Sequence, residues 1–127
     1  MTEHLDLEDL LAAAEAALGG PASVRDIGLL EAAVARTKAS IFGADAYPDL
    51  DSKAAALLQS IVSGHPLVDG NKRLGWVATR LFYRMNDDDL QAPADDGFTL
   101  IIEIADGSLR DVSVIALQLA AWRVPAP

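Results

Sequence analysis

Apolar residues recur at intervals of three and four along almost the whole chain, and no segment shows the strict alternation of a β-strand. This pattern predicts six helices. Their apolar stripes are Leu7, Leu10, Leu11, Ala14 and Leu18; Leu30, Ala33, Val34 and Thr37; Ala54, Leu57, Leu58, Ile61 and Val62; Leu74, Val77, Ala78, Leu81, Phe82 and Met85; Phe98, Ile101, Ile102 and Ala105; and Val112, Ile115, Ala116, Leu119 and Trp122. The expected fold class is therefore all-α, a compact bundle of about six helices.

Turn-forming and capping residues divide these segments. The first helix is expected to follow Asp6, the second to be capped by Asp26, and the third to run from about Asp51. The breaks are Gly19-Gly20-Pro21, a long loop at residues 40–50, His65-Pro66 after Gly64, and residues 86–89 after a fourth helix that begins near Gly70. The fourth helix has the apolar stripe of a central, buried element.

Length and composition narrow the class of protein. With 127 residues and no cysteine, the chain is expected to form a single domain, residues 1–127, in a reducing compartment, and the cytoplasm is the expected location. Neither an export signal nor a membrane-spanning stretch is indicated. The net charge of −9 disfavours direct binding of nucleic acid.

The charge is unevenly distributed. Between His65 and Arg84 the only acid is Asp69, against Lys72, Arg73, Arg80 and Arg84, so this stretch carries 4 − 1 = +3. A basic island in an acidic chain favours a small anionic ligand over a charged polymer.

The stretch HPLVDGNKR, residues 65–73, lies in this island between the third and fourth helices. Free backbone N–H groups at a helix N-terminus attract anions, and Gly70 allows them to converge on a phosphate, with further donors from Asn71, Lys72 and Arg73. Asp69 would then lie beside the phosphate, where a carboxylate can hold Mg²⁺. His65 has the chemistry of a general base. These are the parts that phosphoryl or nucleotidyl transfer needs.

Each residue also has an ordinary structural explanation. Asp69 alone reads as the N-cap of the fourth helix, His65 as a surface histidine, and Lys72 with Arg73 as a solvated face. The conjunction of all of them at fixed spacing argues for a site. His4 is isolated near the N-terminus and is given no role.

HPLVDGNKR resembles the signature of the Fic/Doc superfamily, and residues 19–36 and 47–66 resemble the segments that precede it in Doc-type toxins. The resemblance implies an all-helical fold whose central helix is preceded by a catalytic loop that binds a nucleoside triphosphate with Mg²⁺. Glycine at the position of Lys72 is typical of AMP-transferring members, whereas lysine is typical of Doc-type proteins. Leu67 stands in place of the usual phenylalanine anchor, and Trp76 in place of a second arginine of AMP-transferring members.

The Doc-type resemblance implies an enzyme that transfers the γ-phosphate of ATP to a threonine of the elongation factor that delivers aminoacyl-tRNA, and so arrests translation. It assigns His65 as base, Asp69 as metal ligand and Asn71, Lys72 and Arg73 as phosphate contacts. AMP transfer to a protein hydroxyl is the alternative reaction, and a catalytically silent binding protein is the alternative class.

The resemblance also implies a small, Phd-like antitoxin that folds into a groove near the catalytic loop. The apolar residues of the 40–50 loop are candidates for its contact surface: Ile41, Phe42, Tyr47 and Leu50. Alternatively, these side chains pack onto the bundle.

Overall fold

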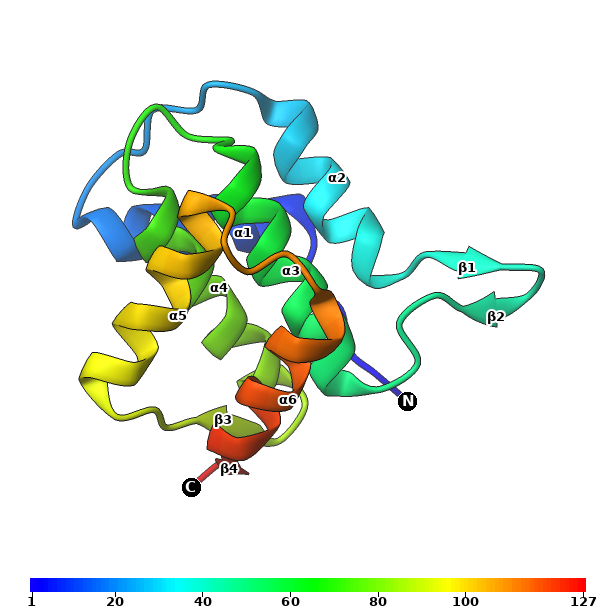
Figure 1. The fold of residues 1–127 in the computed structure, drawn as a ribbon. Coiled ribbons are helices and arrows are strands. Elements are labelled where there is room, and N and C mark those ends of the chain that lie inside the picture. Colours follow the sequence, from blue (N-terminus) through cyan, green and yellow to red (C-terminus); the bar gives the residue numbers. More distant parts are fainter.

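The computed structural model covers residues 1–127 and contains six α-helices, which confirms the predicted fold class (Figure 1). They are α1 (Leu7–Leu18), α2 (Ile27–Thr37), α3 (Leu50–Gly64), α4 (Asn71–Met85), α5 (Ala94–Asp106) and α6 (Val112–Trp122). None of the six is both long and apolar enough to cross a membrane.

Four short strands accompany the helices. β1 (Ser40–Ile41) and β2 (Ala44–Asp45) form an antiparallel hairpin inside the segment expected to be a loop. β3 (Asp88–Leu90) pairs antiparallel with β4 (Arg123–Pro125), so the end of the chain returns to the turn after α4. With two or three residues each, these strands are too short to show an alternating pattern in the sequence.

Aspartates begin most of the helices. Asp6 caps α1 in a reciprocal capping box with Asp9, and Asp26 accepts from the Leu29 N–H at the start of α2. The cap of α3 is Asp49, so the helix begins at Leu50, one residue before the start at about Asp51 that the sequence predicts. Each such cap stabilises its helix by about 1 kcal/mol.

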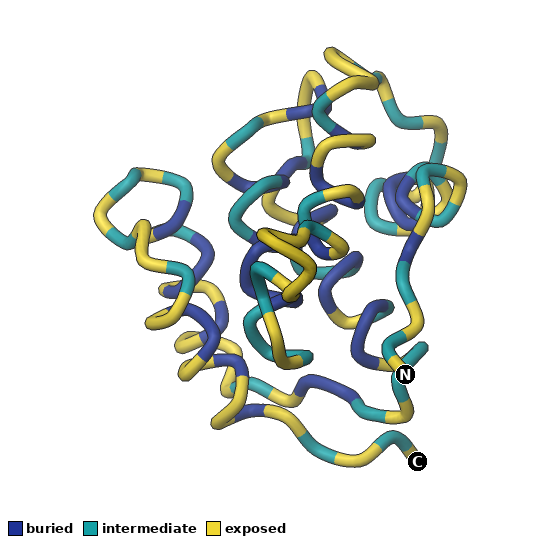
Figure 2. The backbone as a smooth tube through the Cα atoms, turned by 90° about the vertical axis from the view of Figure 1, so that its right-hand side faces the viewer, coloured by how far each residue is buried: buried dark blue, intermediate teal, exposed yellow.

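The bundle is centred on α3, which packs against α2, α4, α5 and α6. Its residues 53–58 are all buried, whereas the apolar stripe of α4 had favoured that helix as the most buried. Figure 2 shows buried positions recurring along the backbone of the bundle, between exposed ones. Three consecutive alanines, residues 54–56, explain the difference, since small side chains let neighbouring helices approach α3 from several sides.

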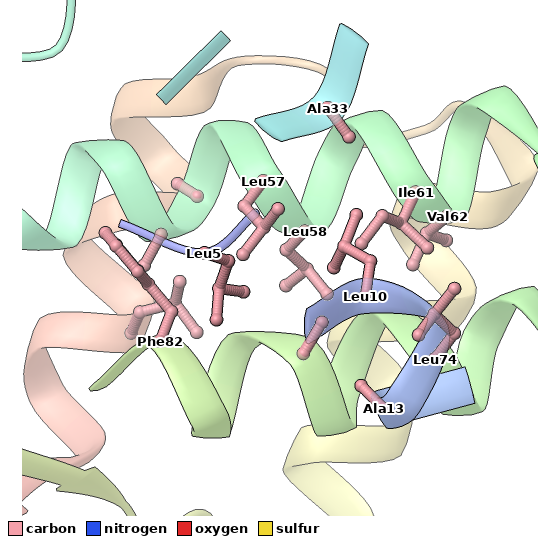
Figure 3. Close-up of a cluster of buried hydrophobic side chains, with 14 of the residues drawn as sticks. Leu5, Leu10, Ala13, Ala33, Leu57, Leu58, Ile61, Val62, Leu74 and Phe82 are labelled. Carbon is pink, nitrogen blue, oxygen red and sulfur yellow. The ribbon is translucent and has the colours of Figure 1, made fainter. Parts of the chain in front are cut away.

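Gly75 sets the distance between α3 and α4. A Cβ at this position would lie 2.6 Å from Val62 Cγ2, closer than side chains pack. In Figure 3, side chains of α3, including Leu58 and Val62, point toward Leu10 of α1 and Leu74 of α4. This contact fixes how the end of α3 meets the start of α4, and the loop between them carries the predicted site.

The N-terminal segment is docked onto the bundle, in contrast to the isolated position expected for His4. The His4 Nδ1 lies 3.1 Å from Thr37 Oγ1, and its ring centroid lies 6.1 Å from that of Phe82. Leu5 is buried in the core. Burial, with a smaller contribution from Lys38, lowers the pKa of His4. His4 thus packs against the C-terminal end of α2 and lies away from the predicted site.

Asp89 is a buried carboxylate held by two arginines of α4. Arg80 binds it through two hydrogen bonds of 3.1 Å, and Arg84 lies 3.0 Å from Oδ2. The hydrogen bond from Arg80 lowers the pKa of Asp89. The ionised Asp89 carboxylate therefore stabilises the folded protein above the pKa of an unfolded aspartate, about 3.9. This stabilisation is lost as the pH falls through the lower pKa that Asp89 has in the folded protein.

At pH 7, Asp89→Asn is expected to lower the free energy of unfolding by about 2 kcal/mol, the scale of hydrogen bonds to charged groups. Urea unfolding of mutant and wild type at pH 7 and at about pH 3 should show the gap narrowing in acid. Asp87→Asn, at an exposed neighbouring position, is the control. A gap that persists in acid would contradict the ion-pair explanation.

Candidate functional site

The loop between α3 and α4 has left-handed backbone at both ends. His65 ends α3 with φ 54° and ψ 58°, and Gly70 precedes α4 with φ 87°. Glycine suits the backbone angle, and a Cβ at Gly70 would lie only 2.3 Å from Leu18 Cδ2, so a larger residue would displace the Leu18 side chain of α1. The loop therefore turns sharply between two helices and lies against the end of a third.

Asn71 and Leu67 fix the interior of the loop. Asn71 is buried; its Oδ1 accepts from the Leu67 N–H at 2.8 Å and its Nδ2 donates to the Leu67 carbonyl at 3.0 Å. Leu67, only 1% exposed, is part of the core, so leucine does fill the anchoring position. The Asn71 side chain is thus engaged inside the loop, and its backbone N–H is the group available to a phosphate.

Residues 23–26 form a second support for the loop, which the sequence pattern did not indicate. The N–H groups of Arg25 and Asp26 donate to the Pro66 carbonyl at 2.8 and 3.0 Å, and the Val68 N–H donates to the Ser23 carbonyl at 2.9 Å. Val24 and Leu67 are paired as in an antiparallel sheet. The connection from α1 to α2 therefore behaves as a short strand laid along the loop.

The N-terminus of α4 presents three free backbone donors. Its first backbone hydrogen bond runs from the Leu74 N–H to the Gly70 carbonyl, and no side chain caps the helix. The N–H groups of Asn71, Lys72 and Arg73 consequently have no acceptor within the protein. Together with the positive end of the helix dipole, they favour an anion at this position.

All the predicted site residues line one cavity of about 370 Å³. Its walls are Leu18, His65, Val68, Asp69, Gly70, Asn71, Lys72 and Arg73. The side chains of His65, Asp69, Lys72 and Arg73 are exposed, so they are accessible to a ligand. The structure thus places the residues of the motif, which the sequence predicts together as a candidate site, around one cavity.

Asp69 is not the N-cap of α4, since Gly70 occupies that position. Its Oδ1 accepts from the adjacent Gly70 N–H at 2.9 Å, which leaves Oδ2 free. No group of three or more potential metal-ligating side chains exists in the chain. The site therefore fits Mg²⁺ held by one carboxylate together with phosphate oxygens and water, rather than a cation bound by protein ligands alone.

The basic island contains fewer unpaired cations than the sequence suggests. Arg80 and Arg84 both bind Asp89, which lies outside the counted stretch. Lys72 and Arg73 form no ion pair and are the cations that line the cavity. The sequence overestimated the positive charge because the partner carboxylate comes from the turn after α4.

An apolar groove of about 560 Å³ continues from the cavity and shares Lys72 and Arg73 with it. Trp76 and Phe98 line this groove, and Trp76 contacts Trp122 edge-on, with ring centroids 6.4 Å apart. A larger cavity, about 650 Å³, lies between α2 and the end of α5 and contains none of the predicted site residues.

Some apolar residues of the 40–50 segment are exposed, as a contact surface requires, and others pack onto the bundle. Phe42 is fully exposed at the hairpin tip with φ 51°, and Ile41 is 62% exposed. Tyr47 packs down: its hydroxyl accepts from Arg36 Nε at 2.9 Å, and the Arg36 guanidinium lies over its ring. Leu50 packs against the core. In Figure 1 the hairpin extends away from the bundle, beyond the C-terminal end of α2. The 11 residues of α2 span about 16 Å.

Comparison with known proteins bears on both the loop and the whole chain. The Fic/DOC family model matches residues 4–83, which include the loop and most of α4. Toxin Doc of Mycolicibacterium smegmatis is 48% identical over 128 residues, an alignment that covers 99% of this chain and 98% of that protein. The similarity to this relative therefore extends through all six helices.

Proposed function

The chain belongs to the Fic/Doc family, and from this premise we propose that it is the toxin of a toxin–antitoxin pair. We further propose that it transfers the γ-phosphate of ATP to a threonine of the elongation factor that delivers aminoacyl-tRNA, in the presence of Mg²⁺, and so arrests translation. The cytoplasm, which holds ATP and the elongation factor, is the proposed location.

One observation carries the proposed chemistry: three free N–H groups at the start of α4 open into the same cavity as His65 and Asp69. The amides would hold the γ-phosphate oxygens, and Lys72 and Arg73 would balance their charge. Asp69 would hold Mg²⁺, which neutralises charge between the phosphates.

In the proposed reaction, the His65 imidazole takes the proton from the threonine hydroxyl. The hydroxyl oxygen forms a bond to the γ-phosphorus, the bond from that phosphorus to the bridging oxygen breaks, and ADP leaves with the electron pair. Positioning and charge stabilisation account for most of the rate, which suits a site built from backbone amides and fixed cations.

AMP transfer remains the second candidate because it would use the same loop. Two residues favour phosphate transfer instead. Lys72 occupies the position at which glycine would leave room for further phosphates, and Trp76 supplies an indole packed on Trp122 rather than a guanidinium.

Radiolabelled ATP tests the proposal. Purified protein, Mg²⁺ and the elongation factor are incubated with ATP labelled at the γ- or the α-phosphate, and label on the elongation factor is measured. Label from γ-ATP alone is the expected result. Label from α-ATP alone would establish AMP transfer, and no label from either would favour a silent binding protein.

For the antitoxin, we propose that the exposed tip of the β1–β2 hairpin, Ile41 and Phe42, is the contact surface. Its base is anchored to α3, because the buried Lys53 binds the Asp45 carboxylate at 3.1 Å and also donates to the Tyr47 carbonyl. Phe42 and Ile41 together expose apolar surface at one tip, and such surface is typical of a site that a partner covers.

Phe42→Asp is expected to weaken antitoxin binding by about thirtyfold or more, the scale of losing one aromatic hot spot, while toxicity is retained. Calorimetry with the antitoxin measures the change. Phe98→Asp, which alters the other exposed phenylalanine, is the matched variant, because Phe98 lines the groove beside the loop. If only Phe98→Asp weakened binding, the antitoxin would occupy that groove and not the hairpin.

A further inference from the structure

Arg25, in the connection between α1 and α2, binds the C-terminal end of α3, which His65 follows directly. Its Nε donates to the His65 carbonyl at 2.7 Å, and its Nη2 donates to the Gly64 carbonyl at 2.9 Å. These carbonyls lie at the C-terminus of α3, where acceptors lack partners within the helix and where the dipole favours a cation. Arg25 itself is exposed and forms no ion pair with any carboxylate.

The two carbonyls belong to the peptide groups on either side of the His65 Cα. The angle φ of His65 sets the orientation of the Gly64–His65 peptide plane relative to the His65 Cα, and ψ sets that of the His65–Pro66 plane. Holding both planes from one rigid guanidinium therefore restrains both angles, and with them the direction of the His65 Cα–Cβ bond.

This restraint matters because His65 adopts φ 54°, a conformation that costs a non-glycine residue about 1–2 kcal/mol. Glycine would adopt it freely but has no imidazole. The backbone of the same segment holds the next carbonyl, since the Arg25 and Asp26 N–H groups both donate to Pro66. Three consecutive carbonyls, those of residues 64, 65 and 66, are thus held by two residues.

We propose that Arg25 is a positioning residue, which fixes the left-handed conformation of His65 and so aims its imidazole into the cavity at the start of α4. The inference rests on the proposed role of His65 as general base. Arg25 acts through the backbone of His65, whereas the amides that would bind phosphate belong to Asn71, Lys72 and Arg73.

Arg25→Ala is therefore expected to lower kcat for phosphotransfer by about tenfold to a hundredfold, the scale of misplacing a catalytic group by about 1 Å. The KM for ATP should change by less than about twofold, since the phosphate-binding amides are untouched. Arg25→Lys should retain an intermediate kcat, because an ammonium can still reach one carbonyl. Arg110→Ala is the matched control: this exposed arginine donates to the Gly107 carbonyl at 2.9 Å, at the end of α5.

A second measurement does not depend on catalysis. The chain has two histidines, so the Cε1–H region of a ¹³C–¹H spectrum contains one signal from His65 and one from His4. In Arg25→Ala the His65 signal should shift and broaden, and hydrogen exchange at the Val68 N–H should accelerate by about tenfold or more, because the strand-like support loosens. The His4 signal, from the docked N-terminal segment, should not move.

A wild-type kcat in Arg25→Ala, or an unchanged His65 signal, would overturn the inference. So would an equal loss of kcat in Arg110→Ala, which would indicate a general effect of removing a helix-end arginine. If the wild-type protein showed no phosphotransfer at all, the proposed function would fail, and the imidazole and exchange measurements would still decide whether Arg25 fixes the conformation of His65.

Discussion

Replacing His65 with alanine is expected to abolish measurable phosphotransfer and growth inhibition, with a fall in rate of about a thousandfold, within the range for loss of a general base. The imidazole lines the cavity that also contains the free amides of α4 and Asp69. No other histidine is available to replace it, since His4 is packed against Phe82 and Thr37.

The protein is expected to remain folded, because the His65 side chain is exposed and contributes little to the core. Alanine does tolerate φ 54° poorly, so His65→Asn is the companion variant: asparagine adopts left-handed backbone more readily and cannot serve as the base. Transfer of label from γ-ATP, growth after induction and helicity by circular dichroism are measured together. His4→Ala is the control and should retain transfer. Undiminished toxicity in folded His65→Asn would end the assignment of His65 as base.

Periodicity and the loop motif predicted the helices and the clustering of the site. Asp6 and Asp26 cap their helices as expected, because an aspartate before an apolar stripe is a local signal. α3 starts at Leu50, one residue before the expected start at about Asp51, because Asp49 has the cap geometry and Asp51 lies in the first turn. His65, Asp69 and Gly70 meet in one cavity because the motif is a single tight loop. Their closeness in the sequence is enough to bring them close in space.

Contacts between distant residues were not predictable from the sequence. Arg25 binds the His65 carbonyl across 40 positions of the chain, and neither spacing nor composition marks it. Arg80 was counted as part of a basic island, yet it binds Asp89 after the chain turns back along α4. Such pairings depend on how helices and turns pack in three dimensions, for which periodicity contains no information.

Lys72→Gly is expected to lower phosphate transfer by about a hundredfold, the scale of removing one preorganised charge contact, and to allow weak AMP transfer. Lys72 lies in the first turn of α4, forms no ion pair, and lines both the cavity and the apolar groove beside it. Its side chain occupies space in which further phosphates would otherwise lie, so a nucleotide is expected to enter with its terminal phosphate toward His65. Its charge would also balance the negative charge that develops on the transferred group.

Lys72→Met separates these two contributions, because methionine keeps most of the volume and removes the charge. If charge dominates, both variants should lose phosphate transfer to a similar extent; if volume decides the orientation of the nucleotide, only Lys72→Gly should gain label from α-ATP. Glycine in the first turn also costs about 1 kcal/mol of helix stability, so urea unfolding of both variants accompanies the assay. Wild-type transfer by folded Lys72→Gly would show that the lysine merely extends into solvent and has no part in phosphate binding.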